Sequence, residues 1–461
     1  MGGHVTVLGA WCRRALVICN HGHGNAMGTE CVMKTGLALL GCGTVGTAVA
    51  EMLLTEKKLL QERSGQSLEL KHILVRNRRR KRAVKAPARL WTTNPADIWA
   101  DPTVDVVVEL IGGLEPARTL ALAALRAGKH LVTANKHLLA VHGAELFAAA
   151  MKARRAVCFE ASCGGAIPII MALTRGLVAN DIQRVIGIVN GTCNYILTEM
   201  SASQRTYTEA LAEAQAAGYA EADPTLDVNG TDSAHKLAIL AALAFGVKVS
   251  FSHIEVSGIH GLQDQDLKYG RELGYVCKLL AIAEKSDHGI SLRVHPTFLD
   301  QKQLLANVNG AFNAISVSGH AAGQTIYYGR GAGPQPTASA VIADIVEASM
   351  GTAAMVFAGL PLLTRRKSMP IVPTRDILSR NYLRMTALDV PGVMHHITGI
   401  LGKEGISIAA VVQHESRVGQ YVPLVVITHE ARDGAVTRAV KKIDRLRCIR
   451  GHTVRIRIME P

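Results

Sequence analysis

The chain has 461 residues, enough for about three domains of roughly 150 residues each, and its 48% hydrophobic and 19% charged residues are typical of a globular protein. Its longest uncharged apolar stretch, residues 237–247, is too short for a transmembrane helix of roughly 18 residues, and its nine cysteines contain no CxxC pair and no zinc spacing. We therefore expect a soluble, cytoplasmic protein with reduced thiols, whose 51 Lys and Arg against 37 Asp and Glu suit an anionic partner.

The first 34 residues show no clear periodicity and lack the charged and apolar regions of a signal peptide. We expect residues 1–34 to form a poorly ordered extension. We do not expect the HGHG run at 21–24 to form a metal site.

Residues 35–161 alternate between strand-like and helix-like apolar segments, which predicts a parallel sheet with crossover helices. The turn GCGTVG falls between the first strand, GLALLG, and the first helix, as in a dinucleotide-binding Rossmann domain. Glycines there allow close backbone approach, and the helix N-terminus favours a pyrophosphate. The residues expected to bind the cofactor are Gly41, Gly43, Thr44, Val45 and Gly46.

The end of the second strand, LELKHILV, indicates which nicotinamide cofactor is used. A carboxylate there would bind the ribose hydroxyl of NAD, whereas an arginine suits the 2′-phosphate of NADP. This chain has Arg76, which opens the basic run RNRRRKR at 76–82. NADP is therefore favoured, with NAD as the alternative. The same run could be a solvated basic turn, but no aromatic-interleaved motif or helix-turn-helix pattern supports nucleic-acid binding.

The segment EADPTLDVNGTDSAHKLAILAALAFG, residues 221–246, concentrates charge in front of a helix that is apolar on nearly every face. Such a helix is buried. Asp232 and Lys236 lie four residues apart on one face of its first turn, where an unpaired charge would be costly and is usually kept for a role. The spacing does not fit a calcium-binding EF-hand.

Six motifs occur together in the order found in homoserine dehydrogenases: GCGTVG, VTANK, EASCGGAIPII, GIVNGTCNYIL, EADPTLDVNGTDSAHK and YGRGAGPQPTASAV. From about residue 35 onward the chain resembles that family, whose members interconvert L-homoserine and L-aspartate 4-semialdehyde with NAD(P)H on the route to threonine, methionine and isoleucine. The departures are small, since Cys163 stands where valine is common and Ala166 where glycine is common.

The resemblance implies roles for individual residues. It makes Lys236 the acid/base residue and Lys136 a second lysine near nicotinamide and substrate. Glu221 and Asp227 would hold the substrate ammonium group, and Asp232 would orient the substrate or a lysine. These duties fit the chemistry, because reducing an aldehyde requires a group that protonates or stabilises the developing alkoxide.

The resemblance also implies a monovalent cation, most often sodium, near the loop EASCGGAIPII. The matching positions are Glu160, Cys163, Gly165 and Ile167, and their contribution would come from backbone carbonyl oxygens. A plain glycine-rich connection between two domains is the alternative for this loop. Gly331 and Gly333, in YGRGAGP, are further candidates for the cofactor side, with a helix-capping turn as their alternative.

The remaining chain is expected to form three further parts. Residues 162–330 would build an α+β domain for substrate binding and dimerisation, and residues 331–364 a helix that returns to the cofactor domain. After a basic, proline-containing linker at 365–380, residues 381–459 have the βαββαβ order of a ferredoxin-like fold. This unit resembles an ACT domain, for which we expect a small effector, threonine, at Asp389 and Gly392.

The fold class expected for the whole chain is therefore α/β with a C-terminal ferredoxin-like domain, in a homo-oligomer, either a dimer or a tetramer. Two other functions fit parts of the sequence: another NAD(P)-dependent oxidoreductase of amino acids, and an amino-acid-sensing protein without catalysis. The second is disfavoured because both lysines and all three glycines of the turn are present.

Overall fold

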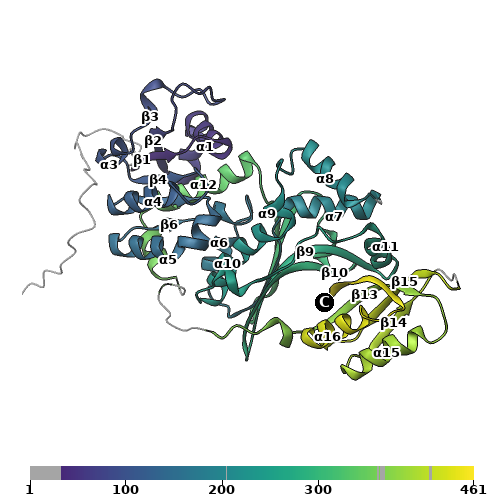
Figure 1. Ribbon diagram of the computed structural model, residues 1–461. Coiled ribbons are helices and arrows are strands. Elements are labelled where there is room, and N and C mark those ends of the chain that lie inside the picture. The colour runs from purple at the N-terminus through teal and green to yellow at the C-terminus, as the bar shows by residue number, and fades with distance from the viewer. Residues whose placement is uncertain (1–32, 204, 361–362, 364–368, 415–417, 461) are drawn as a thin grey trace, which may run out of the picture.

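The computed structural model describes residues 33–203, 205–360, 363, 369–414 and 418–460. Within them the strands form one six-stranded and one eleven-stranded sheet, and the helices pack around both (Figure 1). Residues 1–32 of the expected extension lie outside the described residues, whereas Met33 and Lys34 already belong to the first strand.

The N-terminal domain is a parallel sheet in the order β3-β2-β1-β4-β5-β6, the strand order of a dinucleotide-binding Rossmann fold. Its elements are β1 (Met33–Leu40), α1 (Thr44–Thr55), α2 (Lys57–Ser64), β2 (Gln66–Leu74), η1 (Ala88–Leu90), β3 (Trp91–Thr92), α3 (Ala96–Ala100), β4 (Val106–Glu109), α4 (Ala117–Arg126), β5 (His130–Thr133), α5 (Lys136–Ala153) and β6 (Val157–Cys158). The single helix expected after the glycine turn is divided at Glu56 into α1 and α2, and it ends at Gly65 in a left-handed conformation.

The middle of the chain adds antiparallel strands and the helices that cover them. Its elements are η2 (Glu160–Ser162), α6 (Ile169–Met171), η3 (Ala172–Gly176), β7 (Ile182–Ile188), α7 (Gly191–Ser203), α8 (Tyr207–Ala216), α9 (Thr225–Val228), α10 (Thr231–Phe245), η4 (Phe251–His253), β8 (Glu255–Val256), α11 (Asp264–Glu272), β9 (Tyr275–Ser286), β10 (Gly289–Asp300), η5 (Leu304–Asn307), β11 (Phe312–Gly319), β12 (Gly323–Arg330), α12 (Pro334–Ser349) and α13 (Ala353–Ala358). As Figure 1 shows, α12 returns to the N-terminal domain, where it packs on α1.

The C-terminal unit has the expected βαββαβ order with a short added strand. It contains η6 (Thr374–Asp376), β13 (Leu378–Leu388), α15 (Val393–Lys403), β14 (Ile408–Val412), β15 (Tyr421–Thr428), β16 (Ala431–Arg432), α16 (Asp433–Ile443) and β17 (Ile449–Met459). Its two helices pack on its strands and form with them a separate hydrophobic core, which includes Leu383, Ile397, Val426 and Val436.

The C-terminal unit is not held by its linker alone. Strand β17 pairs in parallel with β10, with Thr297 opposite Arg457 and Leu299 opposite Met459. One sheet therefore runs through both parts in the order β12-β11-β7-β9-β10-β17-β13-β15-β14. The C-terminal unit is therefore joined to the middle of the chain by backbone hydrogen bonds as well as by the linker.

Candidate active site

A cavity of about 930 Å³ opens at the carboxyl ends of β1 and β2. Gly41 lies at its base with a φ of +98°, and a Cβ atom there would come within 2.9 Å of the Leu110 carbonyl oxygen. A Cβ at Gly46 would lie 2.5 Å from the Gly41 oxygen, so this glycine allows α1 to pack against the turn. At Gly43, by contrast, no atom lies within 4 Å of the Cβ position.

The N-terminus of α1 faces this cavity. Gly43 is the N-cap residue, and no side chain caps the helix. Gly41, Gly43 and Thr44 line the cavity, whereas Val45 and Gly46 lie behind them. The backbone N–H groups of a first helical turn and the positive end of the helix dipole favour a phosphate, so the turn fits the pyrophosphate of a dinucleotide.

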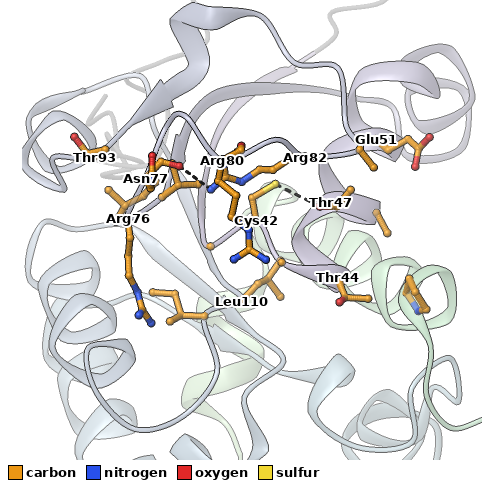
Figure 2. A pocket seen from close by; sticks show the side chains of 18 of the residues that line it. Cys42, Thr44, Thr47, Glu51, Arg76, Asn77, Arg80, Arg82, Thr93 and Leu110 are labelled. Carbon is orange, nitrogen blue, oxygen red and sulfur yellow. Dashed lines mark hydrogen bonds between the residues drawn. The ribbon is translucent and has the colours of Figure 1, made fainter. Parts of the chain in front are cut away.

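Basic side chains form the opposite wall of the cavity, beyond the end of β2. Figure 2 shows Arg76, Arg80 and Arg82 on this side and Thr44 on the helix side. The guanidinium of Arg82 donates to the backbone oxygens of Arg80 and Asn77 at 2.9 and 3.1 Å, so Arg82 shapes the loop. Arg76 is exposed at the strand end, where an adenosine phosphate would bind.

A second polar centre lies where α5 and α10 begin. The Asp232 carboxylate is buried between two ammonium groups, with Lys136 Nζ at 2.7 Å and Lys236 Nζ at 2.8 Å. The Lys236 side chain also donates to the backbone oxygen of Val189 at 2.6 Å and is only 10% exposed. The Lys136 side chain is 39% exposed, so it is the more accessible of the two lysines.

Lys136 reaches this centre because Asn135 fixes the start of α5. The Asn135 side chain accepts a hydrogen bond from Leu138 N and donates to the Gly113 oxygen at 2.7 Å. Capping of this kind sets the direction of the first helical turn. The lysine therefore projects from the carboxyl end of β5 toward α10.

Asn190 joins two acidic side chains of the centre. Its Nδ2 atom donates to Asp227 Oδ1 at 2.7 Å and to Asp232 Oδ2 at 3.0 Å. Asn190 directly precedes α7, and its role was not predicted from the sequence. A signal was present, because an asparagine in GIVNGTCN follows an apolar strand segment and precedes a helix, which is a capping position.

The charges of the centre set the protonation of its members. Burial would raise the pKa of Asp232, but Lys236 and Lys136 together hold this pKa well below its usual range. The pKa of Lys136 is raised because the attraction of Asp232 outweighs desolvation. Burial raises the pKa of Asp227. Asp232 and Lys136 therefore stay charged around neutral pH.

Family models identify the parts of the chain in agreement with this geometry. Residues 41–160 match a model described as the NAD-binding domain of homoserine dehydrogenase, residues 168–346 match homoserine dehydrogenase itself, and residues 381–445 match an ACT domain. The homoserine dehydrogenase of Pseudomonas aeruginosa is 42% identical over 431 residues, which cover 92% of this chain and 98% of that protein. The chain belongs to the homoserine dehydrogenase family.

Solved structures agree with the assignment to homoserine dehydrogenase. A crystal structure of a homoserine dehydrogenase from Thiobacillus denitrificans superposes with a TM-score of 0.87 at 44% identity, covering 93% of this chain and 99% of that chain. A hyperthermophilic archaeal homoserine dehydrogenase in complex with NADPH superposes with a TM-score of 0.57 at 25% identity and covers 69% of this chain. The expected fold class, the oxidoreductase activity and the ACT domain are thereby confirmed.

We call the cluster of Lys136, Asp232 and Lys236 the lysine centre. Not every residue expected at the site of a homoserine dehydrogenase lies in it. Glu221 is exposed, and its backbone oxygen accepts a hydrogen bond from Gln215 at 3.1 Å. Gly331 packs against the side chain of Asn313 and the backbone of Gly165, away from the cavity wall. Gly333 is the N-cap residue of α12, whose first residues, Pro334 and Gln335, line the cofactor cavity.

The loop at 160–167 is hydrogen-bonded to itself and to the start of α6. The Glu160 carboxylate accepts hydrogen bonds from Ile170 N and Met171 N, both at 2.8 Å, and burial raises its pKa to about 7. The backbone oxygens of Glu160 and Ile167 accept from Cys163 N and Ile169 N. In the described part of the chain, no group of three or more His, Cys, Asp or Glu side chains could hold a metal.

The ACT domain places the two expected effector residues at the start of α15. Gly392 is its N-cap residue, with a φ of +92°. Asp389 lies three residues earlier and accepts a hydrogen bond at 3.2 Å from Gln413, which directly follows β14. No described helix of this homoserine dehydrogenase is both long and apolar enough to cross a membrane.

Proposed function

We propose that the Lys136–Asp232–Lys236 centre binds homoserine and moves the proton in an NADP-dependent reaction. The observation that carries this proposal is the single buried carboxylate shared by two lysines from different helices. Such a charged cluster is costly to bury, so its presence in the interior indicates a functional role. NADP, when bound, accepts or returns a hydride at the carbon that bears the homoserine hydroxyl.

The two lysines have different surroundings. Lys236 is fixed by Asp232 and by the Val189 carbonyl, so its ammonium group is held in one orientation. In the reducing direction a fixed ammonium donor stabilises and protonates the developing alkoxide, and in oxidation the neutral amine of Lys236 would accept the hydroxyl proton. Lys136, which is more exposed, would hold the substrate against the nicotinamide. Asp227 would contact the substrate ammonium group.

The preference for NADP rests on Arg76 and the basic loop after β2. An arginine at a strand end suits the 2′-phosphate, which NAD lacks. Comparing the dissociation constants of NADP and NAD in the wild type tests this preference. Equal constants would contradict it.

The ACT domain would bind threonine as a feedback effector and lower the activity of the catalytic part. The supporting feature is the uncapped start of α15 beside Asp389, where backbone N–H groups suit an α-carboxylate and the aspartate suits an ammonium group. The enzyme would then serve the synthesis of threonine, methionine and isoleucine. Homoserine oxidation measured against threonine concentration tests this, and an unchanged rate with no threonine binding would contradict it.

Two further assignments complete the proposal. A monovalent cation, sodium by preference, would be held by the backbone oxygens of Glu160, Cys163, Gly165 and Ile167. The Glu160 carboxylate would not be a ligand, because it already accepts two N–H groups. A homo-oligomer would form through the middle domain. Thermal unfolding in sodium against lithium chloride tests the cation, and sedimentation tests the assembly.

A further inference from the structure

Residues 255–266, which we call the bridging segment, connect the C-terminal unit to the lysine centre. At its first end, Glu255 Oε1 accepts a hydrogen bond from Arg457 Nη2 of β17 at 3.0 Å. The Arg457 side chain is only 13% exposed, and its Nε donates to Asp433 at 2.8 Å. The ion pair therefore lies where the shared sheet joins the two parts.

The other end of the bridging segment is held by β13. Asp266 is fully buried and accepts hydrogen bonds from Arg384 Nε at 2.5 Å and Nη2 at 3.0 Å. The Tyr382 hydroxyl donates to the same carboxylate at 3.1 Å, and Arg384 Nη2 also donates to Gln263 at 2.7 Å. Both ends of the segment are thus bound by side chains of the C-terminal unit.

The middle of the bridging segment lies on the turn that separates Asp227 from Asp232. Ile259 N donates to the Val228 oxygen at 2.8 Å. A Cβ atom at Gly258 would lie 2.0 Å from that same oxygen, so the two backbones are in direct contact. The turn cannot shift without moving the segment, because packed backbones leave no free space.

We propose that the bridging segment couples the ACT domain to the substrate site, with Arg457 and Glu255 as positioning residues for Asp227 and Asp232. This inference rests on the proposed binding of homoserine at the lysine centre. The C-terminal unit holds the segment, the segment holds the turn at 228–230, and the turn sets the separation of the two carboxylates. An effector in the ACT domain would change homoserine binding through this contact.

The test measures KM for homoserine, kcat and the dissociation constant of NADP in the full-length enzyme. Arg457→Gln and Glu255→Gln keep the backbone pairing of β17 with β10 and of β8 with β10, so both variants should fold. We expect each to raise KM for homoserine by about 2- to 30-fold, the range for residues that couple distant sites. Binding of NADP should be unchanged, because neither residue lines the cofactor cavity.

A double-mutant cycle and a matched control complete the test. The Arg457→Gln/Glu255→Gln protein should be no worse than Arg457→Gln alone, because both changes break the Arg457–Glu255 contact and only Arg457→Gln also breaks the contact with Asp433. Arg438→Ala removes an exposed ion pair with Glu404 inside the ACT domain and should leave KM unchanged. Gly258→Ala perturbs the middle contact directly and should also raise KM for homoserine.

Two outcomes separate this inference from the function on which it rests. A wild-type KM in Arg457→Gln, together with a raised KM in Asp227→Asn, would overturn the bridging segment alone. A wild-type KM in Asp227→Asn would overturn the placement of homoserine and the inference with it.

Discussion

Replacing Lys236 by alanine separates proton transfer from cofactor binding. The change removes an ammonium group whose two partners are Asp232 at 2.8 Å and the Val189 oxygen at 2.6 Å. Asp232 would keep Lys136 at 2.7 Å and Asn190 at 3.0 Å, so its charge stays paired. The Val189 oxygen would lose its donor, at a cost of about 1–3 kcal/mol in the free energy of unfolding.

The effect on turnover should be much larger than the effect on stability. Loss of one general acid/base lowers a rate by about 10²- to 10⁴-fold, which is about 3–5 kcal/mol of activation free energy. Binding of NADP should be unchanged, since Lys236 does not line the cofactor cavity.

The assay is steady-state oxidation of homoserine, followed by the absorbance of the reduced nicotinamide, with cofactor binding measured separately by fluorescence. Lys248→Ala, an exposed lysine beyond the other end of α10, is the matched control and should keep full turnover. Near-normal turnover in Lys236→Ala, with a large loss in Lys136→Ala, would refute the reasoning and give the proton transfer to Lys136.

Three other predictions concern the N-terminal domain. Arg76→Ala should weaken NADP binding by about 1.5–3 kcal/mol, the range for hydrogen bonds to charged groups, and equal losses for NAD would show that Arg76 contacts a shared part of both cofactors. Gly43→Ala should leave thermal stability unchanged, because its Cβ meets no atom within 4 Å. It should nevertheless weaken the binding of both NADP and NAD, as measured by calorimetric titration. Burial would raise the pKa of Asp101, but hydrogen bonds from Thr103 and His72 lower it to about 2. The stabilisation from Asp101 is thus complete above about pH 4 and lost as the pH falls to about 2, so Asp101→Asn should lose up to about 2 kcal/mol of unfolding free energy near pH 6 and almost none near pH 2. A constant difference across that range would contradict the assignment.

The sequence predicts best what depends on local spacing. The glycine turn, the alternating elements and the four-residue separation of Asp232 and Lys236 are all properties of short segments, and the observed elements follow them. The family resemblance placed Lys136 near the substrate but did not predict its contact with Asp232, because that contact joins residues almost 100 positions apart in different domains.

What the sequence did not predict depends on contacts between distant segments. The two-residue strand β3 is too short to show a period of two. The pairing of β10 with β17 joins strands that are separated by β11, β12, α12 and most of the ACT domain, and neither strand carries a mark of its partner. The same holds for Asn190, whose two acidic partners come from α9 and α10.

The shared sheet also matters while the chain is being made. Strand β10 leaves the ribosome long before β17, which covers its edge at Thr297–Leu299. Until that partner is synthesised, β10 presents unpaired N–H and C=O groups of the kind that recruit strands from other chains. A nascent chain interrupted before residue 449 would thus carry an open edge within an otherwise folded catalytic part, and we expect such fragments to aggregate or to be held by chaperones.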